Sequence, residues 1–161
     1  MPAPASDEQW MRQAIAQARA GIAAGQSPFG CVIVQADTLL AAGHNQVWAS
    51  GDPTAHAEVC AIRTAAATGR GAALPSGCCL YSTCEPCPMC MAAIHWARVE
   101  RVVYGAAIAD AAAAGFHELQ LSAAELVRLG GSPVRLEAGC LAAECRALFA
   151  EWKAAGRARA Y

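Results

Sequence analysis

Two short segments of the sequence carry residues that can bind a metal ion: His56 stands two residues before Glu58, and Cys87 stands three residues before Cys90. Zinc prefers imidazole and thiolate ligands, and two thiolates spaced Cys-x-x-Cys can converge on one ion. A helix expected to start at Cys87 further stabilises thiolate charge. His56, Cys87 and Cys90 make three protein ligands and leave a fourth position for water, which is typical of a catalytic zinc site.

Glu58 is expected to move protons rather than to bind the metal. On a helix, residues two apart diverge by roughly 200°, so His56 and Glu58 cannot both ligate one ion without strain. In a first helical turn, both side chains can still border the same cavity. Glu58 is then placed beside the water, where it can take a proton and pass it on as a general acid and base.

The cysteines also permit an iron–sulfur interpretation. The run Cys84-x-x-Cys87-x-x-Cys90 has a spacing seen in such clusters, but no fourth Cys follows at the ferredoxin spacing. That interpretation also leaves His56 and Glu58 without a purpose. Cys84 is instead expected to be a small buried residue at the end of a strand.

A non-enzymatic interpretation also stays open, because Cys-x-x-Cys on its own occurs in redox motifs and in structural zinc sites. A zinc-stabilised interaction domain needs a fourth protein ligand that closes the site. Cys60 and His44 are the candidates for that fourth ligand if the chain folds back on itself.

The elements that must position these residues alternate between helix and strand. Apolar residues at helical spacing and short β-branched runs predict the order of the elements. The first half of the sequence is expected to form a helix capped by Ser6 and ended by Gly25 and Pro28, a hairpin of strands 31–34 and 39–42, a polar loop 44–53, and a helix 55–68 capped by Thr54. The second half is expected to form a strand 79–82, a helix opened by Pro86 and Pro88 and running to 97, strands 101–104 and 134–136, and a helix 141–153. This order predicts a single α/β domain over residues 1–161, with helices on both faces of one mixed sheet.

Composition limits the class of partner. The 161 residues suit one domain with a hydrophobic core, and 56% of them are hydrophobic. The formal net charge is -1, so the basic excess typical of nucleic-acid-binding proteins is missing and a small or neutral partner is favoured. Nine cysteines, an odd number, cannot all pair within the chain and predict a reducing compartment, the cytoplasm. Neither a signal peptide nor a membrane-spanning segment is expected.

The runs Asp52-Pro53-Thr54-Ala55-His56-Ala57-Glu58-Val59 and Cys84-Glu85-Pro86-Cys87-Pro88-Met89-Cys90 resemble the cytidine deaminase-like superfamily. Its zinc nucleobase deaminases carry H-x-E followed by P-C-x-x-C. Within it, the sequence is most similar to the small bacterial guanine deaminases and the related guanosine deaminases, from about residue 28 to about residue 116. The resemblance implies a three-layer α/β/α sandwich with a five-stranded mixed sheet, one Zn²⁺ per subunit and a homodimer. It also implies hydrolysis of a purine base, guanine, to xanthine and ammonia.

The same resemblance implies residues that bind the substrate. Phe29 corresponds to a Phe that lines the base pocket, where a flat apolar ring can stack on a purine. Asn45 corresponds to an Asn whose amide hydrogen-bonds the purine edge with a paired donor and acceptor. Trp96 corresponds to a Trp in the pocket wall.

Two further positions come from the resemblance near the C-terminal end of the sequence. Guanine deaminases carry Gly-Phe followed by acidic residues, one of which is a second proton shuttle. Here His117 takes the first acidic position, and Glu118 is the remaining candidate. Tyr161 matches a terminal Tyr that, in guanine deaminases, reaches the active site of a neighbouring subunit in a swapped dimer.

Other substrates stay open at the level of sequence. A tRNA adenosine deaminase shares both zinc motifs, but it needs basic surface to hold an RNA loop. The near-neutral charge, the Gly-Phe-His-Glu segment and the ending in Tyr161 disfavour it. Guanosine, cytosine, and an aminated triazine or pterin differ from guanine in size and hydrogen-bond pattern, which residue identities alone do not settle.

Overall fold

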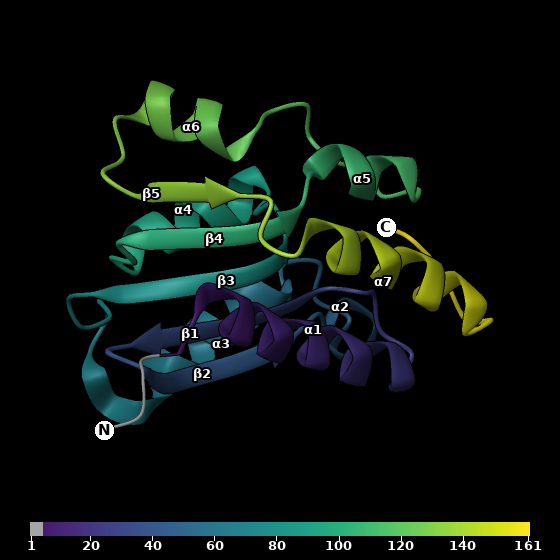
Figure 1. Cartoon of the computed structure of the whole chain (residues 1–161), viewed down its shortest axis with the longest axis horizontal. Coiled ribbons are helices and arrows are strands. Elements are labelled where there is room, and N and C mark those ends of the chain that lie inside the picture. The colour runs from purple at the N-terminus through teal and green to yellow at the C-terminus, as the bar shows by residue number, and fades with distance from the viewer. Residues whose placement is uncertain (1–4) are drawn as a thin grey trace.

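A computed structural model describes residues 5–161, which form a five-stranded mixed sheet (Figure 1). The strands are β1 Gly30–Gln35, β2 Thr38–His44, β3 Cys78–Cys84, β4 Arg101–Ala106 and β5 Arg135–Ala138. Their order in the sheet is β2-β1-β3-β4-β5. β1 runs antiparallel to β2 and β3, whereas β3, β4 and β5 are parallel. The predicted five-stranded mixed sheet is confirmed.

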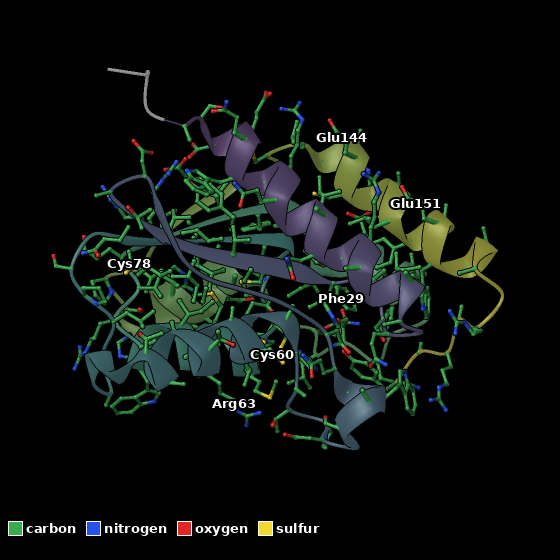
Figure 2. All side chains as sticks on the ribbon, turned by 90° about the horizontal axis from the view of Figure 1, so that it is seen from below. Phe29, Cys60, Arg63, Cys78, Glu144 and Glu151 are labelled. Atoms are coloured by element: carbon green, nitrogen blue, oxygen red, sulfur yellow. The ribbon has the colours of Figure 1, made fainter. Side chains whose placement is uncertain are left out.

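Helices cover both faces of this sheet, as predicted (Figures 1 and 2). Helices α1 Asp7–Ala23 and α7 Ala142–Ala154 pack on one face. Helices α3 Ala57–Ala65, α4 Pro88–Trp96 and α6 Ala123–Gly130 pack on the other. The short elements are α2 Val47–Ser50, the π-helical turn η1 Ala66–Arg70 and α5 Ile108–Ala113. Among the described residues, every helix is too short or too polar to cross a lipid bilayer.

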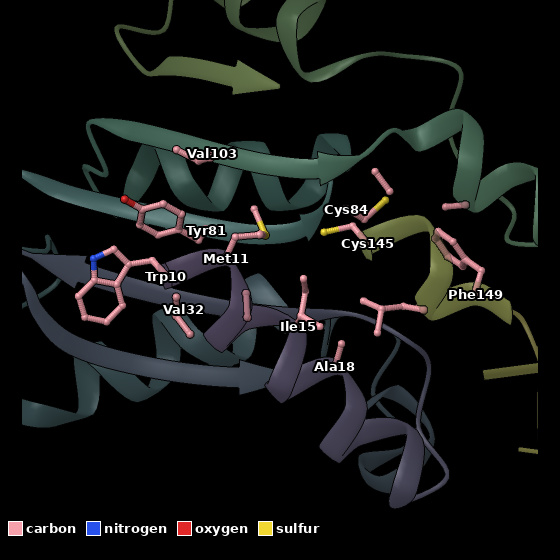
Figure 3. Close-up of a cluster of buried hydrophobic side chains, with 14 of the residues drawn as sticks. Trp10, Met11, Ile15, Ala18, Val32, Tyr81, Cys84, Val103, Cys145 and Phe149 are labelled. Atoms are coloured by element: carbon pink, nitrogen blue, oxygen red, sulfur yellow. The ribbon is translucent and has the colours of Figure 1, made fainter. Parts of the chain in front are cut away.

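Strand alternation divides the core into two clusters. Successive strand side chains point to opposite faces, so Val32 of β1 packs under α1 and α7 whereas Ile33 packs under α3 and α4. The first cluster fills the space between α1, α7 and the sheet with large side chains such as Met11 and Phe149 (Figure 3). The second cluster combines small alanines of α3 with Ile94 of α4. The alanines let α3, which follows the candidate ligand His56, lie close to the sheet.

The first helix fixes the start of β1. Ser6 accepts a hydrogen bond from the backbone of Gln9, and the Gln9 side chain accepts one from the backbone of Ser6, which is the predicted capping box. At Gly30, a Cβ atom would lie only 2.1 Å from the backbone oxygen of Ala14. Only glycine therefore allows α1 to approach β1 this closely, and this contact sets the position of the adjacent Phe29.

The helix predicted over 55–68 is wrong at both ends. Thr54 does not cap it, because its hydroxyl donates to Asp52 Oδ1 at 2.7 Å within a turn. His56 takes the N-cap position instead, and α3 begins at Ala57. Toward its C-terminal end, the α-helix gives way to the π-helical turn η1 after Ala65. The two-residue shift matters because it places His56 at the helix entrance.

Several other boundaries differ from the expectation. The predicted loop 44–53 contains the short helix α2, and the predicted strand 134–136 lies at 135–138 as β5. The last helix starts at Ala142, because Leu141 adopts a left-handed conformation with φ 49°. Helices α5 and α6 are not predicted individually, because they are only six and eight residues long and four of the six α5 residues are alanine.

Candidate active site

His56, Cys87 and Cys90 meet at the N-terminal ends of two helices. His56 is the N-cap residue of α3, Cys87 is the N-cap residue of α4, and Cys90 lies in the first turn of α4. His56 Nδ1 lies 3.6 Å from Cys87 Sγ and 3.5 Å from Cys90 Sγ. A tetrahedral ion with Zn–S of about 2.3 Å and Zn–N of about 2.0–2.1 Å separates these atoms by about 3.6 Å. The three side chains therefore fit a zinc ion.

The alternative fourth ligands are engaged elsewhere. His44 Nδ1 lies 2.9 Å from the backbone oxygen of Asn45, and the Cys60 thiol donates to the backbone oxygen of Ala55. Within residues 5–161, the candidate metal group comprises His56 and the two thiols of the Cys-x-x-Cys motif. This three-ligand group supports an open, catalytic kind of site over a closed structural one.

Glu58 stands beside the three ligands in the first turn of α3. Its side chain is buried, and both of its carboxylate oxygens have partners. The Ser82 hydroxyl on β3 donates to Oε1 at 3.1 Å, and the Cys90 thiol lies 3.5 Å from Oε2. Burial raises the pKa of Glu58, and the thiolate of Cys87 raises it further, whereas His56 opposes the shift. A carboxyl group whose pKa is moved toward neutrality is suited to exchange protons.

The two thiols of the Cys-x-x-Cys motif have different acidities. The pKa of Cys87 is lowered to about 4, mainly because its thiolate accepts a hydrogen bond from the Cys90 thiol, with a further contribution from His56. The pKa of Cys90 is raised well above its usual range, because its proton is held by Cys87 and its side chain is buried. Metal binding at this site must therefore release the proton of Cys90.

A cavity of about 310 Å³ opens onto these groups. Nine residues that are far apart in the sequence line it: Phe29, Asn45, His56, Glu58, Cys84, Glu85, Cys87, Glu118 and Tyr161. A second cavity of about 550 Å³ shares His56, Cys87, Glu118 and Tyr161 with the first and extends past Met89 and Leu119. Glu118 and Tyr161 therefore border both cavities.

Aromatic rings frame the inner cavity. The ring of Phe29 meets the rings of Phe116 and Phe149 edge to face, with centroids 4.9 Å and 5.8 Å apart. Phe116 in turn meets the ring of Tyr161 at 5.3 Å. This arrangement gives Phe29 a fixed orientation at the border between the core and the cavity.

Asn45 is fully buried, and its amide is oriented by two hydrogen bonds. Its Oδ1 accepts from the backbone N–H of Val47 at 3.1 Å, and its Nδ2 donates to the Tyr161 hydroxyl at 2.5 Å. Tyr161 is held at its other end, because its backbone oxygen accepts from the N–H of His117 at 3.0 Å. Tyr161 thus lies in the cavity of its own chain, with its ring centroid 5.5 Å from that of His56.

Glu118 lines the cavity from the segment that follows α5. Its pKa is raised to about 7, first by burial and then by the nearby Cys87 thiolate. His117, its unusual neighbour, borders the outer cavity and is absent from the lining of the inner one. Although His117 takes the position of the first acidic residue, the carboxyl group of Glu118 borders the site.

Trp96 does not lie with the other candidates. It occupies the last position of α4, where its side chain is 73% exposed, and it borders neither cavity of this chain. The inward-facing positions of α4 are Cys90, Met91 and Ile94, so a residue two beyond Ile94 points to solvent. The expectation of a pocket-wall role for Trp96 is therefore not met within a single chain.

Sequence reasoning missed three residues at the site. Cys84 is expected at a strand end, where it lies, but it also borders the cavity. Ser82 contacts Glu58, and because it stands two residues after Leu80 on β3, the strand period places both side chains on the α3 face. Glu85 stands two residues before Cys87, and no local pattern in the sequence indicates that its carboxyl group is buried.

Comparison with known proteins agrees with this geometry. Residues 4–106 match the family described as the cytidine and deoxycytidylate deaminase zinc-binding region. The chain is 49% identical over 112 residues to a guanine deaminase of Bacillus subtilis (strain 168), which covers 69% of this chain and 71% of that protein. It is 37% identical over 99 residues to a tRNA-specific adenosine deaminase of Aquifex aeolicus (strain VF5), covering 62% of this chain and 65% of that one.

The fold is shared with solved structures along almost the whole chain. A guanine deaminase structure from Nitrosomonas europaea has a TM-score of 0.86 at 30% identity and covers 95% of this chain and 87% of its own. A structure of a tRNA:A34 deaminase has a TM-score of 0.72 at 30% identity, covering 86% and 97%. The matched zinc-binding region contains the three residues that the structure brings together as a metal site. The chain therefore belongs to the cytidine and deoxycytidylate deaminase family of zinc-dependent hydrolytic deaminases.

Proposed function

We propose that the chain deaminates guanine, converting guanine and water into xanthine and ammonia. The observation that carries this proposal is the inner cavity, whose lining combines the zinc ligands His56 and Cys87 and the carboxyl group of Glu58 with Phe29 and Asn45. Such a space offers a purine a flat apolar ring and an amide beside the reacting groups. The similarity to a guanine deaminase at 49% identity supports the choice of base.

The protons are moved by two carboxyl groups of this chain. When bound, Zn²⁺ supplies a Lewis acid that makes water nucleophilic near neutral pH. Glu58 takes the proton of the attacking water and delivers it to a ring nitrogen of the base, beside the carbon that carries the amino group. The departing amine then needs a proton to leave as ammonia. Glu58, once it has taken the second proton of the added water, and Glu118, a partly buried carboxyl group that borders the cavity, are the groups that can give it.

Substrate recognition is assigned to Phe29, Asn45 and Tyr161. The Asn45 oxygen accepts one hydrogen bond from Val47 and its amide nitrogen donates one to Tyr161, so a second oxygen lone pair and a second N–H can serve a base. Tyr161 accepts one of these N–H groups, which makes the Tyr161 ring the group that a bound purine must contact or displace. Burial raises the pKa of Tyr161, so its hydroxyl stays protonated and can donate to an acceptor on the base.

The alternative substrates are larger or differ in hydrogen bonding. A tRNA anticodon loop needs basic surface, whereas the formal charge of the chain is -1. An attached ribose needs space beyond the base, and the outer cavity adjoins the inner one at Glu118 and Tyr161. Guanosine is therefore the nearest alternative, followed by cytosine and by aminated triazines or pterins.

The assembly proposed is a homodimer of single-domain subunits located in the cytoplasm. Support for a dimer comes from Trp96 and Leu129, which are 73% and 65% exposed on the adjacent helices α4 and α6. Trp96 then belongs to an interface and borders the neighbouring subunit rather than its own cavity. Exchange of the segment that ends in Tyr161 between subunits stays a prediction, as does the cytoplasmic location, which rests on the cysteine content.

An ammonia-release screen of the purified zinc protein tests the substrate proposal. The compounds are guanine, guanosine, adenine, cytosine and ammeline, with Glu58→Gln as the inactive control. We expect guanine to give the highest kcat/KM and xanthine as its product. A preference for guanosine or cytosine, with guanine unreacted, contradicts the assignment.

A further inference from the structure

Glu85 is a buried acidic residue that the proposed chemistry does not use. It lies in the loop between β3 and α4, two residues before the zinc ligand Cys87, and only 9% of its surface is exposed. Its backbone N–H donates to the oxygen of Ala106 at 2.7 Å, which joins this loop to the end of β4. A carboxylate in such a place needs hydrogen-bond donors, because burying an unpaired charge is costly.

The donors are backbone N–H groups at the starts of two helices. Glu85 Oε2 accepts from the N–H of Ile108, the first residue of α5, at 3.0 Å. Glu85 Oε1 accepts from the N–H of Ala123, the first residue of α6, at 2.8 Å. One carboxylate therefore holds two points of the chain that are 15 residues apart, and both hydrogen bonds involve a charged acceptor, the stronger kind.

Glu118 lies on the stretch of chain between these two points. This stretch leaves α5 after Ala113 and has no regular element until α6 begins. Within it, the N–H of Phe116 bonds to the oxygen of Ala111, and the N–H of Glu118 bonds to the oxygen of Phe116. The position of the Glu118 carboxyl group relative to the zinc ligands thus depends on where the two helix starts are held.

We propose that Glu85 is a positioning residue that ties the segment carrying Glu118 to the loop carrying Cys87. This inference rests on the proposed function, in which Glu118 delivers a proton during loss of ammonia. The carboxylate suits the role because its two oxygens can each accept one N–H in a fixed geometry. An amide in its place keeps the size but turns one acceptor into an N–H donor that opposes a backbone N–H.

The first test is Glu85→Gln, assayed as the zinc-loaded protein with guanine. Because misplacing a reacting group by about 1 Å can cost about 100-fold in rate, we expect kcat to fall by roughly 10-fold to 100-fold. KM and zinc content should change by less than about twofold, because base binding does not depend on Glu118 in this account. Amide hydrogen exchange at Ile108 and Ala123 should become faster. Unchanged kcat with unchanged exchange overturns the inference.

Glu100→Gln is the matched control. Glu100 also holds a backbone turn with its carboxylate, accepting from the N–H of Gly77 at 2.8 Å and from the Ser76 hydroxyl at 2.9 Å. It borders neither the inner nor the outer cavity. We expect its kcat to match that of the unchanged protein. If Glu85→Gln fails to fold, Glu85→Asp keeps the charge but shortens the reach, and the same selective loss of kcat is expected.

A double-mutant cycle with Glu118→Gln separates this inference from the proposed function. If Glu85 acts through Glu118, then Glu85→Gln should lower kcat by less than about twofold once Glu118 is replaced. Independent, multiplicative losses overturn the positioning role and leave the proposed function intact. A fully active Glu118→Gln removes the proton role of Glu118 from the proposed function, and the positioning role of Glu85 falls with it.

Discussion

At the scale of single residues, the metal site depends on how two helix starts present their first side chains. His56 and Cys87 are both N-cap residues with extended backbone, at ψ 158° and 167°, which turns their side chains toward the space in front of the helices. Cys90 follows one turn into α4 and reaches the same point. Glu58, at the second position of α3, is left beside the ligands rather than among them.

A comparison of two cysteines in the same cavity tests the ligand assignment. Cys87→Ala should lose zinc and with it some stability, because binding energy at a metal site contributes to folding. Cys84→Ala is the matched control, since Cys84 borders the cavity but its thiol donates to the backbone oxygen of Ala107. Metal analysis of the two purified variants should find zinc only in Cys84→Ala. Full zinc in Cys87→Ala contradicts the assignment.

At the scale of elements, the sequence predicted the order of helices and strands around the site but not each boundary. His56 and Glu58 are expected near a helix start because the predicted helix begins at about residue 55, after Thr54. The helix starts two residues later than expected, because Thr54 takes part in a turn with Asp52, a local alternative to N-capping. No local pattern predicts the role of Glu85, because its partners, Ile108 and Ala123, are remote in sequence.

The contact between Trp48 of α2 and Arg159 near the C-terminal end is a second feature that the sequence does not predict. Trp48 Nε1 donates to the backbone oxygen of Arg159 at 3.1 Å, and the Arg159 guanidinium lies 3.9 Å from the centre of the Trp48 indole. These contacts join residues 111 positions apart, so no local pattern reveals them. They dock the segment that carries Tyr161 into the cavity.

Replacing Trp48 tests this docking. A cation–π contact and one neutral hydrogen bond together contribute about 1–2 kcal/mol. In Trp48→Leu, we therefore expect faster tryptic cleavage after Arg157 and Arg159, and a higher KM for guanine with zinc content unchanged. Leu39→Ala, which shortens an exposed side chain on β2 that lines neither cavity, serves as the control. Equal cleavage rates in the two variants contradict the docking role.

At the scale of the whole molecule, exposed apolar groups on α4 and α6 bear on assembly. Trp96→Lys places a charge in the proposed interface and should shift sedimentation toward the monomer at micromolar concentration. Leu39→Lys, at another partly exposed apolar position on β2, should leave the assembly unchanged. A protein that sediments as a monomer before any substitution contradicts the proposed dimer.

Arg101 joins distant parts of the molecule through two carboxylates. Its guanidinium lies 2.6 Å from Asp7 at the start of α1 and 2.6 Å from Glu137 on β5. The hydrogen bonds from Arg101 lower the pKa of both carboxyl groups below their usual values. A lowered folded-state pKa stabilises the fold above the unfolded values, about 3.9 and 4.3, and this stabilisation is lost as pH falls through the folded-state values.

The pH dependence of unfolding tests this network. Both carboxylates are partly exposed, so screening limits the expected effect to about 1 kcal/mol at pH 7. Denaturant titration of Arg101→Met should show that loss at pH 7 and a smaller one near pH 3. Arg12→Met, which removes an exposed pair with Glu8, is the control and should change little at either pH. An equal loss for Arg101→Met at both values contradicts the electrostatic account.

The central claim is that Glu58 moves the protons of a zinc-dependent deamination. Glu58→Gln keeps the shape of the side chain and leaves the three zinc ligands in place, and loss of a general acid–base group typically costs about 10²–10⁴-fold. The decisive measurement is therefore single-turnover deamination of guanine by zinc-loaded Glu58→Gln. A rate at least about 100-fold below that of the unchanged protein, with full zinc content, is the predicted result. Near-normal turnover with full zinc contradicts the account.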